Sequence, residues 1–110
     1  MHLTGANYMI PNALGAKMPT DTGLTRDSEK TVTDKAKITP MLKKAMDHAR
    51  AAIAAAMDDP GKATKLFGKD STNSAASLLV ITHMHEHLGQ SIAYARSAGV
   101  VPPWSTGGRE

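Results

Sequence analysis

The stretch of sequence that decides the fold runs from Ser74 to Ala98 and reads SAASLLVITHMHEHLGQSIAYARSA. At about 100° per residue on a helix, most of its apolar side chains fall into two adjoining stripes. The first stripe consists of Ala76, Leu79, Val80, His83, His87, Gln90 and Tyr94, and the second of Ile81, Met84, Leu88, Ile92 and Ala95. Because the two stripes cover more than half of the circumference, this helix needs neighbours on more than one side.

Capping residues predict where this helix begins and ends. The short side chains of Ser71, Thr72 and Asn73 are suited to accept hydrogen bonds from the free amides of a first turn. Gly99 is suited to end the helix. Residues 99–110, which include two prolines and a tryptophan, are predicted to form an extended C-terminal tail.

Two further helical segments precede this one. Residues 1–15 form the first, and Pro11 predicts a kink in it because proline lacks an amide proton and crowds the carbonyl of Asn7. Residues 37–57 form an amphipathic second helix, with Pro40 in its first turn or just ahead of it. The turn at residues 58–61 ends this helix, and the basic residues 62–70 are predicted to form a solvated loop.

The composition fits a single all-α domain spanning residues 1–110. Of the 110 residues, 41% are hydrophobic but only 4% are aromatic, which suits close-packed helices better than a β-sandwich. The absence of cysteine excludes disulfide scaffolds and thiolate metal sites. The net charge of +3 is too small to predict nucleic-acid binding. With no apolar run of membrane-spanning length and no visible signal peptide, we expect a cytoplasmic protein with no membrane partner.

The last helix also carries the candidate chemistry. His83 and His87 are four residues apart, so both rings lie on one face of the helix and can share a metal ion. Glu86 lies near the edge of that face. Its carboxylate is a candidate either to accept a hydrogen bond from a ligand histidine or to act as a base toward a water molecule. His2 lies on the inner side of the first helix and completes a candidate three-histidine site. The alternative is that the histidines line a core and bond to one another or to water.

The same residues resemble a known family. Residues 83–90 read HMHEHLGQ and are followed by Tyr94-Ala95-Arg96, Gly99 and Pro102-Pro103-Trp104-Ser105. Together with the opening His2-Leu3 and Ala6-Asn7-Tyr8, this pattern resembles the DinB-like family of metalloenzymes. The resemblance implies a four-helix bundle in which His2, His83 and His87 hold a divalent ion, Zn or Ni. It also implies a metal-dependent hydrolase or a transferase that uses a low-molecular-weight thiol.

The first helix of that family has no counterpart here, so the resemblance implies a truncated bundle of three main helices. We expect a truncated gene product, a fragment, or a short form in which a partner subunit replaces the missing helix. Removing one helix from a bundle uncovers an apolar strip, and Ile81, Met84, Leu88 and Ile92 form such a strip. We therefore predict a symmetric homodimer with this strip at or near its interface.

Two functions are compatible with these features. In the first, the chain is a DinB-like metal-dependent hydrolase or thiol transferase that acts on a small molecule. In that interpretation Gln90 orients the ligand histidines and Tyr94 lines the pocket. In the second, the chain is a non-enzymatic helical interaction and dimerisation module whose histidines are vestigial.

Overall fold

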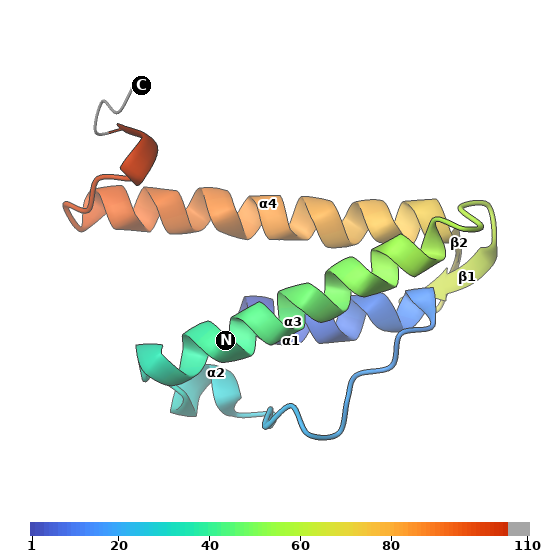
Figure 1. Cartoon of the computed structure of the whole chain (residues 1–110), viewed down its shortest axis with the longest axis horizontal. Coiled ribbons are helices and arrows are strands. Elements are labelled where there is room, and N and C mark those ends of the chain that lie inside the picture. Colours follow the sequence, from blue (N-terminus) through green and yellow to red (C-terminus); the bar gives the residue numbers. More distant parts are fainter. Residues whose placement is uncertain (106–110) are drawn as a thin grey trace.

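The computed structural model describes residues 1–105, and the last five residues of the predicted tail lie outside the described part (Figure 1). It is mostly helical, with three main helices and one small antiparallel hairpin. The elements in chain order are α1 (His2–Met9), η1 (Ile10–Leu14), α2 (Ser28–Thr31), α3 (Lys35–Ala56), β1 (Ala63–Leu66), β2 (Lys69–Thr72), α4 (Asn73–Ser97) and η2 (Pro103–Ser105).

The three main helices pack around a small core at the end of the molecule near the hairpin. Helix α1 packs against α3, and η1 packs against the first half of α4. Figure 1 shows α3 and α4 close together beside the hairpin and diverging away from it, with the C-terminal part of α4 extending past the other helices. Within residues 1–105, no helix is long and apolar enough to cross a membrane.

Alanine allows the helices to approach closely. Ala45, Ala49 and Ala76 have no exposed surface, and Ala49 packs with Ala6, Ile10 and Val80 in one buried cluster. Since alanine has the highest helix propensity and the smallest side chain that still has a Cβ atom, it favours both the helices and their short separation. The low aromatic content of the sequence therefore corresponds to a core of small side chains.

The hairpin shows that the prediction of a solvated loop for residues 62–70 was wrong. Strand β1 pairs with β2 in an antiparallel register in which Ala63 lies opposite Thr72. Phe67 and Gly68 form the two-residue turn, and both have positive φ values, 51° and 80°. A two-residue turn of this kind matches the twist of the flanking strands. The all-α fold class is therefore right for the main elements and incomplete for these residues.

The two prolines affect their helices differently. The predicted break at Pro11 is present as the change from α-helix to 3-10 helix at Ile10. Pro40, in contrast, lies inside α3 and not at its start. The helix begins earlier than predicted because the side chain of Asp34 accepts a hydrogen bond from the amide of Ala36, at 2.9 Å, and caps the first turn. Because proline has no amide hydrogen, residue 40 donates no hydrogen bond to the Ala36 carbonyl, its partner in a regular α-helix.

The cap of α4 provides a test of how its start is stabilised. Thr72 is the N-cap, and its hydroxyl accepts a hydrogen bond from the amide of Ala75 at 3.3 Å. We expect Thr72→Ala to lower the free energy of unfolding by about 1 kcal/mol, because an amide of the first turn loses its partner. Urea unfolding measures this, and Thr72→Ser should retain most of the stability. Equal unfolding midpoints for wild type and Thr72→Ala would contradict the assignment of this cap.

Candidate metal centre

The histidine pair of α4 is arranged by the helix itself. His83 and His87 lie one turn apart with ring centroids 4.5 Å apart, and their Nε2 atoms are separated by 3.2 Å. Two nitrogens bound to one tetrahedral zinc ion lie about 3.4 Å apart, for Zn–N distances of about 2.1 Å. The spacing of this pair therefore fits two ligands of one ion.

Helix α1 brings His2 to the same place. The ring of His2 lies with its centroid 5.6 Å from that of His83 and 5.0 Å from that of His87. One ring nitrogen from each of the three histidines lies within 4.8 Å of the others. His2 is exposed while His83 and His87 are half-buried. The donor set, three imidazole nitrogens with no cysteine, suits a borderline divalent ion such as Zn or Ni.

A carboxylate from a different element supports His2. Helix α2 presents Glu29, whose Oε1 lies 3.0 Å from Nδ1 of His2. A carboxylate only accepts, so His2 donates from Nδ1, and this tautomer leaves its Nε2 lone pair available for a ligand. Histidines that bind metal usually have such a partner on the second nitrogen, which orients the ring and raises its basicity. Glu29 was not predicted from the sequence, because it is 27 residues from His2 in a polar segment without a periodic pattern.

The other predicted site residues lie on the surface of α4. Glu86 and Gln90 are exposed, and the Glu86 carboxylate accepts a hydrogen bond of 3.5 Å from the Gln90 amide instead of from a histidine. Tyr94 is 77% exposed. The structure therefore brings His2, His83 and His87 together and leaves Glu86, Gln90 and Tyr94 outside this cluster.

The two remaining histidines are separate from the cluster. His85 is exposed, and its Nδ1 lies 3.0 Å from the carbonyl of Ile81, to which it donates. His48 lies on α3, half-buried, with its ring against Tyr8. His85 is therefore a natural control for experiments on His83 and His87.

The surroundings of His83 favour its neutral form. Burial lowers the pKa of His83 below its usual value of 6.5, and the positive charges that His87 and His2 would carry lower it further. The Glu86 carboxylate opposes this effect. Since only the neutral imidazole binds metal, His83 is in its ligand form at neutral pH.

The low pKa of His83 predicts how the metal-free protein responds to pH. The folded state binds fewer protons than the unfolded state, so the stability due to neutral His83 is complete above about pH 6.5 and is lost as the pH falls toward its folded pKa. Urea unfolding across about pH 5 to 8 should show this loss, and His83→Gln should reduce it while His85→Gln does not. The same pH slope in His83→Gln and wild type would contradict this assignment.

Comparison with known proteins gives no match: no family model, no curated protein and no solved structure matches this chain. The resemblance to the DinB-like family stays a prediction, and what bears on function is the arrangement of the residues themselves.

Proposed function

We propose that the chain is a divalent-metal-binding protein in which His2, His83 and His87 hold one ion, Zn or Ni. The observation that carries the proposal is the convergence of three imidazole nitrogens within 4.8 Å of one another, contributed by helices from opposite ends of the sequence. A DinB-like helical bundle is the architecture that this proposal assumes. The cytoplasmic location and the absence of a nucleic-acid partner stay predictions.

The reaction class follows from the number of protein ligands. Three histidines leave one position open for water or substrate, whereas structural zinc sites normally use four protein ligands. A divalent ion bound here would lower the pKa of a water molecule or a thiol at that position. The chain itself supplies the orientation: Glu29 fixes the tautomer of His2, and one turn of α4 aligns His83 with His87. We therefore propose a metal-dependent hydrolase or thiol transferase with a small-molecule substrate.

Elemental analysis tests whether the protein binds a metal ion. Protein purified without a histidine tag and dialysed against excess Zn or Ni should retain stoichiometric metal, and a chelator should lower its melting temperature because the ion binds only the folded state. Protein that stays metal-free, with a melting temperature unchanged by metal or chelator, would contradict the proposal.

A substitution of Glu29 tests whether its contact with His2 supports metal binding. Glu29→Gln keeps the shape of the side chain but removes the carboxylate charge that fixes the His2 tautomer. We expect metal affinity to fall about tenfold to a hundredfold, as is typical when a partner of a ligand histidine is changed. Competition with a chromophoric chelator measures this. Glu86→Gln, on the exposed face of α4, is the matched control, and an equal effect of both variants would show that Glu29 has no special role.

One observation favours the second function, a helical interaction module. A groove of about 610 Å³ lies between α3 and α4 and is lined by Leu42, Met46, Ile53, Ile81 and Met84. It continues into an apolar depression that includes Leu88. Lys43, Asp47 and Arg50 contribute both signs of charge to its α3 side, which suits a two-fold related copy of the same surface. We propose a homodimer through this groove, which is compatible with either function.

A further inference from the structure

A second group of titratable side chains lies apart from the three histidines. It surrounds a pocket of about 460 Å³ formed by α1, α3 and the loop that follows η1. The polar side chains of the lining are Tyr8, Asp21, Thr22, Lys44 and His48. Pockets of this volume are typical of sites for small molecules.

The base of the pocket is formed by two packed rings. Tyr8 is only 5% exposed, and its ring centroid lies 5.1 Å from that of His48. The Nε2 atom of His48 is buried and has no hydrogen-bond partner among the residues that the structure describes. Burying an imidazole nitrogen without a partner costs free energy, and such groups often mark functional positions. The bottom of the pocket therefore contains a polar nitrogen, Nε2 of His48, that packing alone does not require.

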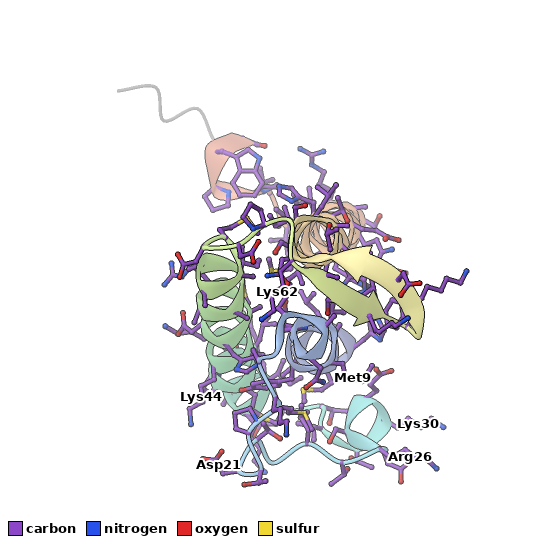
Figure 2. All side chains as sticks on the ribbon, turned by 90° about the vertical axis from the view of Figure 1, so that its right-hand side faces the viewer. Met9, Asp21, Arg26, Lys30, Lys44 and Lys62 are labelled. Carbon is purple, nitrogen blue, oxygen red and sulfur yellow. The ribbon has the colours of Figure 1, made fainter. Side chains whose placement is uncertain are left out.

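Two side chains of opposite charge also line this pocket, and they form no ion pair within the described part of the chain. Lys44 on α3 and Asp21 in the loop take part in none of the ion pairs among residues 1–105. Figure 2 shows both on the same side of the molecule, with Lys30 of α2 on the other side. Burial and the nearby Asp21 carboxylate raise the pKa of Tyr8, so its hydroxyl stays protonated and able to donate. The pocket therefore offers a cation, Lys44, and an anion, Asp21, with the protonated Tyr8 hydroxyl near the anion.

The loop that carries Asp21 is held by its own hydrogen bonds. The amide of Leu24 donates to the hydroxyl of Thr22 at 3.3 Å, and the amide of Thr25 donates to Ser28 at 2.8 Å. Gly23 has a φ of +69° and lies beside Met41, which lines the same pocket. A wall that is ordered before binding reduces the entropy lost when a ligand binds.

We propose that this pocket binds a small molecule that carries both an ammonium and a carboxylate group, of which a free amino acid is the simplest example. The ammonium group would pair with Asp21, and the carboxylate with Lys44. A ligand with only one charge would leave one of the two protein charges unpaired and would face a like charge across the pocket. This site does not depend on metal at the three histidines.

Four probes test the proposal by NMR titration of the full chain. γ-Aminobutyrate carries both charges, and butyrate and butylamine carry one charge each. Glycine carries both charges at a shorter spacing. We expect a two-charge probe to shift the signals of Tyr8 and His48 and to bind at least about tenfold more tightly than either single-charge probe. Equal affinities for all probes, or no saturable shift below about 10 mM, would overturn the proposal.

Charge variants show whether the probe binds in this pocket or elsewhere on the chain. Lys44→Met and Asp21→Asn each remove one charge at an exposed position and should each weaken binding of the two-charge probe by about tenfold. Lys30→Met, outside the pocket, and His87→Ala, at the metal centre, should bind the probe as wild type does. Binding unaffected by Lys44→Met and Asp21→Asn would overturn the proposal. Loss of probe binding in His87→Ala would do the same, because it would place the probe at the histidines.

Discussion

Replacing His87 by alanine is expected to abolish stoichiometric binding of Zn or Ni. His87 is the central member of the cluster, with its ring 4.5 Å from that of His83 and 5.0 Å from that of His2. Structural zinc sites with four protein ligands have an apparent binding free energy of ~10–16 kcal/mol, which is roughly 2.5–4 kcal/mol per ligand. On this scale we expect affinity to fall by about a hundredfold to a thousandfold, measured by chelator competition on protein without a histidine tag.

His85→Ala is the matched control for that experiment. It removes the same chemical group from the same helix, two residues away, but His85 is exposed and bonds to the carbonyl of Ile81. We expect His85→Ala to bind metal as wild type does. Equal losses in both variants would mean that α4 binds metal through scattered surface imidazoles, and the three-histidine centre would be wrong.

The second large effect concerns assembly. We expect the chain to be a homodimer at micromolar concentration, with twice the mass of the 11.6 kDa chain in light scattering. Ile81 and Leu88 of the predicted strip are 38% and 53% exposed, and Met84 and Ile92 are half-buried. The strip adjoins the groove between α3 and α4, so a second copy would cover apolar side chains of both helices. Burial of each large aliphatic side chain contributes about 1.5–3 kcal/mol.

Leu88→Glu should dissociate this dimer. A symmetric interface contains every substituted position twice, so we expect the dissociation constant to rise by about a hundredfold or more. Leu78→Glu is the control, because Leu78 is an equally apolar residue of α4, 60% exposed, that does not line the groove. A wild-type monomer that unfolds cooperatively would refute the homodimer. Dissociation by Leu78→Glu but not by Leu88→Glu would show that a different face of α4 forms the interface.

Local sequence predicted the long helices well. Helix α4 was expected over residues 74–98 and is observed as Asn73–Ser97, with Thr72 among the three expected caps and Gly99 at a positive φ. Helix α3 was expected over residues 37–57 and is observed as Lys35–Ala56. Both are defined by periodicity and by capping residues within a few positions. The His83–His87 pair follows from the same local geometry, since a spacing of four fixes the relation of two side chains on any helix.

Features that involve residues far apart in the sequence were harder to predict. The hairpin was missed because its strands are only four residues long and its turn contains Phe67 at a positive φ, a conformation that non-glycine residues rarely adopt. Glu29 was missed because nothing near His2 in sequence indicates a partner in a four-residue helix. Glu86 was predicted as a partner of a ligand histidine because it lies near the edge of the helical face that carries His83 and His87, but its side chain accepts a hydrogen bond from Gln90.

The helices, their apolar faces and the His83–His87 pair could be predicted from the residues alone, because these features depend on interactions within one or two helical turns. Tertiary packing, in contrast, brings His2 to His83 and His87, places Glu29 beside His2, and leaves Tyr94 on the surface. The histidine cluster depends on how α1 lies against α3 and α4, and the Glu29 contact depends on where α2 lies beside His2. Close packing of Ala6, Ala49 and Val80, which come from three separate helices, sets the arrangement of α1, α3 and α4. No sequence pattern within a single segment indicates which other segments it will contact in the folded chain.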